Sequence, residues 1–276
     1  MLLGYNTNGF AHHRLSDTLA ILSELGYQSV AITLEREHLD PPDHSGVAAC
    51  VKRLREALSG TRLRCTIETG SRFLLDPRRK HQPTLLSPDE AARRSRIDFL
   101  LAAIEVAAEL RADSVSIWSG TPEFDEPADA LFDRLCRSLE TLLDGAATHG
   151  VRLAFEPEPG MFVETMDQFA HLHSRLAHPS FGLTLDVGHV HCLGDGTVGE
   201  HALRWRDSLW NVHLDDARRG VHEHLMFGEG EMDSPGVLQD LVRAGYAGPA
   251  HVELSRHSHD AVRMARRCME ILGPHF

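Results

Sequence analysis

The sequence predicts an α/β protein of the (β/α)8 TIM-barrel class. Short apolar segments, often rich in β-branched residues, alternate with helical patterns along the whole chain. The apolar segments lack strict alternation with polar residues, which is typical of parallel strands that are buried on both faces. The chain has 276 residues, and barrels of this class typically have about 250.

Eight apolar segments are expected to form the strands. They are Leu2–Asn6, Ser29–Leu34, Arg62–Thr69, Ser114–Trp118, Arg152–Glu156, Gly182–Asp186, Leu209–His213 and Ala250–Leu254. A doubly wound parallel sheet would give the same alternation. However, no GxGxxG motif follows the first strand and the sequence contains no P-loop, so we expect a closed barrel.

Seven clear helical patterns lie between or after these strands. They are Ser16–Leu25, Gly46–Ser59, Ser87–Leu110, Pro127–His149, Thr165–Leu176, Ser234–Ala244 and Ser258–Leu272. Ser16 is expected to cap the first helix, and Ser-Pro-Asp-Glu at residues 87–90 is a strong helix start. The segment Gly194–Asp207 has the weakest helical pattern. No low-complexity run and no Pro/Gly linker divides the chain, so we expect a single domain over residues 1–276.

The composition narrows the classes of function. The formal net charge is −12, whereas nucleic-acid-binding proteins usually carry a basic face, so a nucleic-acid partner is disfavoured. No segment approaches the roughly 20 apolar residues of a membrane helix, and the first residues lack the pattern of a secretory signal. The five cysteines are never in CxxC spacing, which favours a reducing compartment. We expect a cytoplasmic protein without a membrane partner.

The fifth to eighth predicted strands each end on an acid or a histidine: Glu156, Asp186, His213 and Glu253. In a barrel the carboxyl ends of the strands meet at one face. Each residue alone could cap a helix or pair with an arginine, but three carboxylates gathered without a cation would repel one another. Carboxylates with one imidazole suit a divalent ion such as Mn²⁺, Zn²⁺, Co²⁺ or Mg²⁺. We therefore expect one divalent metal ion at these four residues.

Two further features are expected to face the same end of the barrel. The side chains of Glu158 and Glu156 are expected to point to the same side of the strand. Glu158 could therefore be the metal ligand instead of Glu156, support that ligand or contact the substrate. The segment Gly70–Thr84 follows the third strand, is long for such a junction and carries several basic residues, including Arg72. It is either a solvated loop or a lid whose cations meet an anionic substrate group. Glu68, just before this segment, is a candidate for binding substrate hydroxyls.

Three motifs in the second half of the chain resemble the xylose-isomerase-like barrel superfamily. They are Leu-Asp-Val-Gly-His at 185–189, Val-His-Leu-Asp-Asp at 212–216 and Phe-Gly-Glu-Gly-Glu-Met-Asp at 227–233. The superfamily includes sugar isomerases and epimerases, inosose dehydratases and the zinc-dependent apurinic endonucleases of AP endonuclease family 2. Its members often assemble as dimers or tetramers, so a homo-oligomer is expected by analogy.

The resemblance implies roles for the strand-end residues. Glu156, Asp186, His213 and Glu253 would hold one divalent metal. In the epimerase branch, the two glutamates also transfer protons on opposite faces of a bound ketose, and the metal stabilises a cis-enediolate. His189 matches a position that contacts a substrate oxygen. Arg218 or Arg219 matches a region that binds sugar oxygens or a phosphate, and Arg219 is our assignment.

The endonuclease branch implies a second interpretation of the histidines. By analogy with its additional zinc sites, His189, His222 and His224 could hold a second Zn²⁺, since three imidazoles suit zinc. A substrate-binding pair or plain surface histidines are the alternatives. Where that branch uses two further histidines, this chain has Glu68 and Trp118-Ser119. These departures, with the acidic net charge, disfavour DNA repair.

The first functional hypothesis is a metal-dependent isomerase or epimerase acting on a sugar, sugar acid or polyol-derived ketone through an enediolate. A lyase of the inosose-dehydratase kind is the main alternative, because it begins with the same proton abstraction. A zinc-dependent phosphodiester hydrolase would need additional metals and a basic groove. A barrel that only binds a metabolite is disfavoured by the four strand-end residues. The expected partner is a small carbohydrate-like molecule with an anionic group as an option.

Overall fold

Eight parallel strands form the barrel that the sequence predicts. The structure is a computed structural model that describes residues 1–36 and 46–276. The strands are β1 (Leu2–Asn6), β2 (Ser29–Thr33), β3 (Arg64–Glu68), β4 (Val115–Ile117), β5 (Leu153–Phe155), β6 (Phe181–Asp186), β7 (Leu209–Leu214) and β10 (Pro249–Val252). Their hydrogen-bonded order, β1-β10-β7-β6-β5-β4-β3-β2, is closed. The (β/α)8 barrel class is thereby confirmed, and each predicted strand is found to within a few residues.

The chain forms two compact units. The first unit comprises Met1–Ile32, Glu56–Thr66 and Leu183–Phe276, and the second comprises Thr33–Arg55 and Ile67–Gly182. None of the described helices is both long enough and apolar enough to cross a membrane.

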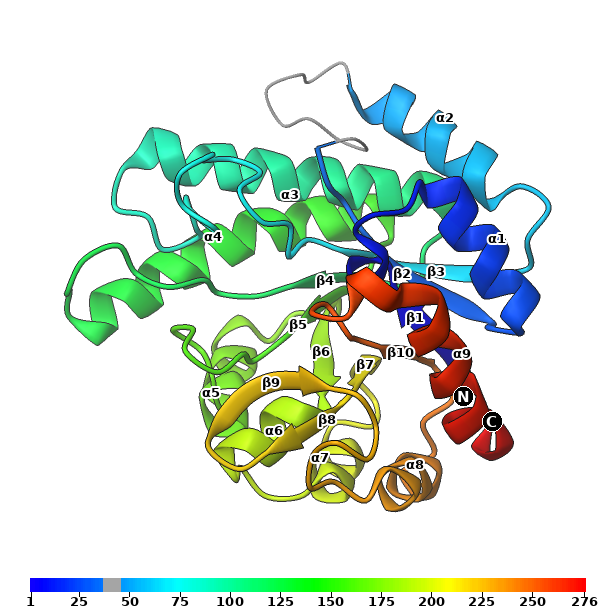
Figure 1. Ribbon diagram of the computed structural model, residues 1–276. Helices are drawn as coiled ribbons and strands as arrows, with labels where there is room; N and C mark the ends of the chain where they lie inside the picture. The colour runs from blue at the N-terminus through cyan, green and yellow to red at the C-terminus, as the bar shows by residue number, and fades with distance from the viewer. Residues whose placement is uncertain (37–45) are drawn as a thin grey trace. The chain divides into compact units, whose positions relative to one another are not determined.

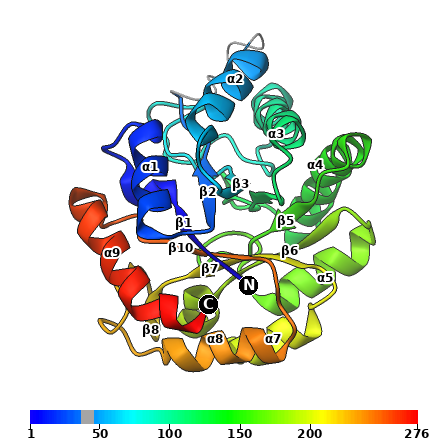
Figure 2. The same cartoon turned by 90° about the vertical axis from the view of Figure 1, so that its right-hand side faces the viewer.

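In the first unit, the two ends of the chain lie side by side (Figures 1 and 2). Strand β1 pairs with β10, with Leu3 opposite Ala250. Helix α1 (Leu15–Leu25) packs against α9 (Ala261–Leu272), and the Tyr27 hydroxyl donates to the Ala265 carbonyl over 2.8 Å. The N-terminal and C-terminal segments are therefore joined both in the sheet and between helices.

The remaining elements of the first unit connect β6 to β10. They are α6 (Val187–Leu193), α7 (Val198–Arg204), α8 (Ser234–Arg243) and the antiparallel hairpin of β8 (Asp216–Arg218) and β9 (Val221–Leu225). Figure 1 shows the hairpin lying beside α6, and the two elements are in contact. Helix α7 falls within the weak pattern at Gly194–Asp207, whereas neither α6 nor the hairpin is expected from the sequence.

The second unit contains α2 (Gly46–Leu58), which continues into the first unit, and the long helices α3 (Glu90–Leu110) and α4 (Ala128–His149), followed by α5 (Met166–Leu176). Helices α3 and α4 pack together, with Gly145 directly against the Leu101 side chain. Asp89 caps α3, and Thr165 caps α5 through a capping box with Gln168. These caps begin the helices close to the predicted positions.

The expected cap of the first helix is wrong. Helix α1 begins at Leu15, with Arg14 at the N-cap position and no side-chain cap. Ser16 lies inside the first turn, where its hydroxyl contacts Asp17. A serine at this position satisfies no free amide at the helix start, so the sequence pattern misplaces the cap by two residues.

Candidate metal centre

Asp186 ends β6 and at the same time caps α6. Its Oδ1 accepts a hydrogen bond of 2.8 Å from the backbone N–H of His189, and its side chain is fully buried. An aspartate at a helix N-cap satisfies an amide that has no partner within the helix. The His189 ring turns back towards this carboxylate, with Nε2 3.8 Å from Oδ2. The Leu-Asp-Val-Gly-His motif therefore contains both the end of β6 and the start of α6.

His213 and Glu253 join Asp186 from the neighbouring strands of the first unit. On β7, His213 lies opposite Asp186 of β6 and opposite His251 of β10. Its Nδ1 is 2.8 Å from Glu253 Oε2 and 3.8 Å from Asp186 Oδ2. Asn8 donates to the other oxygen of Glu253 over 2.8 Å. The ligand atoms of Asp186, His213 and Glu253 lie within 4.8 Å of one another.

Charges around Glu253 keep it ionised. Burial by itself would raise the pKa of its carboxyl group, but the electrostatic attraction and hydrogen bond of His213, with help from His224 and Asn8, hold the pKa well below its usual range. The Glu253 and Asp186 carboxylates both lie within 4 Å of the same imidazole nitrogen, His213 Nδ1. This donor set matches hard divalent cations.

Glu156 and Glu158 lie in the second unit, at the end of β5. Glu156 follows the last residue of the strand, is buried, and donates its backbone N–H to the Ile117 carbonyl over 2.8 Å. Glu158 is more exposed, and its backbone N–H donates to the Val163 carbonyl over 3.3 Å. Of the two acids, Glu156 is the one placed at a strand end like Asp186 and buried.

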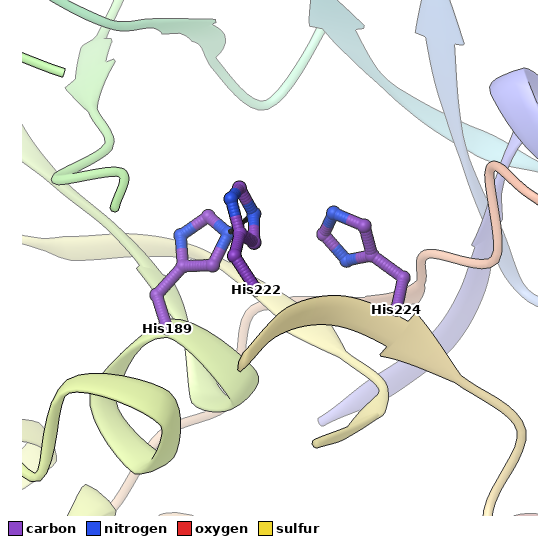
Figure 3. Close-up of side chains that lie close together, drawn as sticks. All are labelled: His189, His222 and His224. Carbon is purple, nitrogen blue, oxygen red and sulfur yellow. Dashed lines mark hydrogen bonds between the residues drawn. The ribbon is translucent and has the colours of Figure 1, made fainter. Parts of the chain in front are cut away.

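A cluster of three imidazoles lies beside the carboxylates of the first unit. Figure 3 shows His189 coming from α6 and the pair His222 and His224 coming from β9. His222 Nε2 is 3.1 Å from His189 Nε2, and one nitrogen of each ring lies within 4.8 Å of the other two. Two nitrogens bound to one tetrahedral Zn²⁺ at 2.0–2.1 Å lie about 3.3 Å apart. The spacing therefore suits two ligands of one zinc ion.

Asp215 orients the third imidazole of this cluster. Its Oδ2 is 2.8 Å from His224 Nδ1, and both side chains are largely buried. Burial by itself would lower the pKa of His224, but the hydrogen bond and charge of Asp215, with the charges of Glu253 and Asp186, raise it to about 10. Because Nδ1 is engaged by Asp215, Nε2 is the nitrogen of His224 that can serve as a ligand.

The backbone of the Phe-Gly-Glu-Gly-Glu-Met-Asp motif at residues 227–233 wraps around the side chain of Asp216. Its carboxylate accepts backbone N–H bonds of 2.8, 2.9 and 3.0 Å from Gly228, Gly230 and Met232. A Cβ at Gly230 would overlap both the Asp216 carboxylate and the Ala217 carbonyl. The motif thus closes the hairpin around a buried acid, and neither Asp215 nor Asp216 is singled out by sequence reasoning.

The predicted substrate-binding residues lie in different parts of the structure. Arg219 is exposed in the turn between β8 and β9, with its guanidinium at Gly194, the C-cap of α6. Asp186 and His189 lie at the opposite end of that helix, so the structure does not bring Arg219 to them. In the second unit, Glu68 is buried at the end of β3, whereas Arg72 is exposed.

The basic segment Gly70–Thr84 has no regular secondary structure but is held at several points. Arg96 of α3 donates to the carbonyls of His81 and Pro83 over 2.9 and 2.8 Å. Arg79 forms ion pairs with Asp76 and Glu123. The cation of Arg79 is therefore engaged within the protein, whereas Arg72, Arg78 and Lys80 are exposed.

Comparisons with known proteins agree with the barrel fold. The model of a family described as xylose isomerase-like TIM barrel matches residues 19–272. A fructoselysine 3-epimerase of Shigella flexneri is 24% identical over 276 residues, covering 98% of this chain and 96% of the relative. A xylose isomerase of Thermus thermophilus is 27% identical over 273 residues, covering 90% and 68%.

Solved structures show the same fold at lower identity. The structure of an L-ribulose 3-epimerase superposes with a TM-score of 0.78 at 18% identity, covering 99% of this chain and 94% of the other. The structure of an IOLI protein with a zinc atom superposes with a TM-score of 0.77 at 20% identity, covering 100% and 99%.

Proposed function

Because the chain belongs to the xylose isomerase-like TIM barrel family, we propose that it is a divalent-metal-dependent isomerase or epimerase of a sugar, sugar acid or polyol-derived ketone. The observation that carries the proposal is the group of Asp186, His213 and Glu253, gathered at the ends of three neighbouring strands. The names of the relatives, which include sugar epimerases and a xylose isomerase, support the reaction class.

The proposed metal ligands are Asp186, His213, Glu253 and Glu156. The first three offer two carboxylates and one imidazole within a few ångströms, which fits Mn²⁺, Zn²⁺, Co²⁺ or Mg²⁺. Glu156 is proposed as the fourth because it holds the same position on its strand, directly at the carboxyl end, and is buried. Its burial and strand-end position favour it over Glu158.

The two glutamates are also the proposed proton-transfer groups. The bound ion supplies Lewis-acid polarisation of a ketose carbonyl and its neighbouring hydroxyl. Glu253 is ionised, as a general base must be, and it is the proposed acceptor of the proton from the carbon beside the carbonyl. Glu156 would return a proton to the opposite face of that carbon. Glu68, Glu158 and Arg72 are proposed to contact the substrate, because each lies at or just after the carboxyl end of a strand.

The three-imidazole cluster supports a second metal ion as an additional proposal. His189, His222 and His224 present nitrogens at a spacing that suits one Zn²⁺, and Asp215 fixes the orientation of His224. The alternative role is the binding of substrate oxygens by the same rings. A count of bound metal separates the two, since the first role requires two ions per chain.

The reaction is tested by hydrogen exchange in D₂O. The protein is stripped with a chelator, reloaded with Mn²⁺ or Zn²⁺, and incubated with a panel of ketoses while proton NMR follows the carbon-bound hydrogens. We expect the hydrogen beside the carbonyl of one ketose to exchange and an epimer or aldose to accumulate. Loss of water to an unsaturated ketone would identify the lyase instead. Absence of exchange from every ketose in the metal-loaded protein would contradict the proposal.

A further inference from the structure

A chain of buried polar side chains runs from His213 away from the proposed metal site. The Asn211 side-chain amide lies 3.1 Å from His213 Nε2 and 2.9 Å from His251 Nδ1. His251 Nε2 lies 2.9 Å from Ser29 Oγ, which in turn lies 3.2 Å from the Arg64 backbone carbonyl oxygen. Asn211, His251 and Ser29 are fully buried within the first unit.

The His251 ring is fixed in this chain by its neighbours on the strands. Gly4 of β1 lies opposite His251 in the sheet, and a Cβ at Gly4 would overlap the imidazole. Ser29 of β2 holds the far nitrogen of the ring. The ring is therefore confined, while the Asn211 amide can exchange its N–H and C=O ends by rotating half a turn about its terminal torsion.

We infer that Asn211 is a positioning residue that couples the tautomer of His213 to that of His251, so that metal binding at His213 reverses the hydrogen bonds of the whole chain as far as Ser29. The inference rests on the proposed metal-binding role of His213. It goes beyond that role because it assigns a function to Asn211 and His251, which are not proposed ligands.

In the structure the Asn211 amide is oriented so that His213 cannot bind a metal ion through Nδ1. Asn211 donates its N–H to His213 Nε2, so the proton of the neutral ring is on Nδ1, where Glu253 accepts it over 2.8 Å. His251 then donates from Nδ1 to the Asn211 carbonyl oxygen and accepts at Nε2 from the Ser29 hydroxyl. A metal ion between Asp186 and Glu253 needs the lone pair of Nδ1, which is occupied by this proton.

The reversed orientation of the Asn211 amide frees the lone pair of His213 Nδ1 without any net uptake of protons. His213 carries its proton on Nε2 and donates it to the rotated Asn211 carbonyl oxygen. The Asn211 N–H donates to His251 Nδ1, His251 carries its proton on Nε2 and donates to Ser29 Oγ, and the Ser29 hydroxyl donates to the Arg64 carbonyl. Each ring has one proton before and after. The chain ends on a carbonyl that only accepts, so each of these hydrogen bonds keeps one donor and one acceptor once a metal ion replaces the Nδ1 proton.

The test is imidazole ¹⁵N–¹H NMR of the full chain, without metal and after addition of Zn²⁺, because the two tautomers give different patterns of two-bond coupling. We expect both His213 and His251 to change from the Nδ1–H to the Nε2–H form when Zn²⁺ binds. Zinc binding at His213 with an unchanged His251 tautomer would overturn the inference alone. A His213 spectrum that does not respond to Zn²⁺ would instead overturn the proposed metal site.

Variants of Asn211 supply a second measurement. Asn211→Leu removes both hydrogen bonds, and we expect Zn²⁺ affinity to fall about 10- to 100-fold. The carboxylate of Asn211→Asp can only accept hydrogen bonds, so it holds His213 in the Nε2–H form. We expect the Zn²⁺ affinity of this variant to be at least that of the wild type. Ser138→Ala removes an equally buried hydroxyl, which donates to the Leu85 carbonyl, and should leave affinity unchanged. Equal loss of affinity in the Asp and Leu variants, with both folded by circular dichroism, would contradict selection of a tautomer.

Discussion

Asp215 and His224 form an ion pair of 2.8 Å in which both side chains are largely buried. The pair joins the residue that follows β7 to the middle of β9, so it fixes the hairpin against the proposed metal centre. Gly188 of α6 leaves room for the Asp215 carboxylate, since a Cβ there would overlap it. The orientation of one imidazole in the three-histidine cluster is therefore determined by an acid from another element.

Replacing Asp215 should weaken the second metal site. In Asp215→Asn the side chain no longer provides a carboxylate to fix His224 Nδ1, so we expect the affinity of the second Zn²⁺ to fall about 10- to 100-fold, measured by titration with a chromophoric chelator. The exposed Asp207 supplies the control, Asp207→Asn, which should bind zinc as the wild type does. Unchanged affinity in Asp215→Asn would mean that His224 is not a ligand.

The same ion pair predicts how the stability of the metal-free protein depends on pH. The pKa of His224 is raised to about 10 in the folded protein, above its ordinary value of about 6.5. Protonation therefore stabilises the folded state fully below about pH 6.5, and this contribution is lost as the pH rises towards 10. We expect urea unfolding to show lower stability at pH 9.5 than at pH 7, with a smaller difference in Asp215→Asn. An equal pH dependence in both proteins would contradict this assignment.

The barrel strands could be predicted because each is a short buried apolar run, and the strand-end residues follow directly from those runs. Asp186, His213 and Glu253 are found together because sequence position alone fixes which end of a strand they occupy. The β8–β9 hairpin could not be predicted in the same way. Val221–Leu225 is half-exposed and carries polar residues at its centre, so it lacks the apolar pattern of a strand.

Long-range partners explain the other differences between sequence and structure. Helix α6 has seven residues, too few to show a helical period. The role of Asp216 depends on three backbone amides that lie 12 to 16 residues later in the chain, and a local pattern gives no sign of them. The hairpin turn places the Arg219 guanidinium beside Gly194, at the far end of α6 from Asp186, and its role in binding substrate stays a prediction.

Gly230 should tolerate no side chain. In Gly230→Ala the Cβ would overlap the Asp216 carboxylate and a backbone carbonyl, so the turn must move and hydrogen bonds to Asp216 are lost. We expect destabilisation of about 1–3 kcal/mol or more by urea unfolding. Gly220→Ala is the matched control, because a Cβ there meets no atom within 4 Å and only its positive φ of 71° is unfavourable. A smaller effect at Gly230 than at Gly220 would contradict the role of the Asp216 turn.

Glu253→Gln should separate catalysis from folding. The amide keeps the size of the side chain and can still accept from Asn8, but it cannot take up a proton from substrate and is a weaker metal ligand. We expect turnover of the substrate found in the D₂O screen to fall at least 10²- to 10⁴-fold, the usual contribution of a general base, while circular dichroism and the unfolding midpoint show a folded protein. Glu105→Gln, an exposed change on α3, should retain full activity. Because the variant also weakens the metal site, turnover is measured at saturating Mn²⁺ with bound metal quantified. Wild-type turnover in metal-loaded Glu253→Gln would show that another group removes the proton.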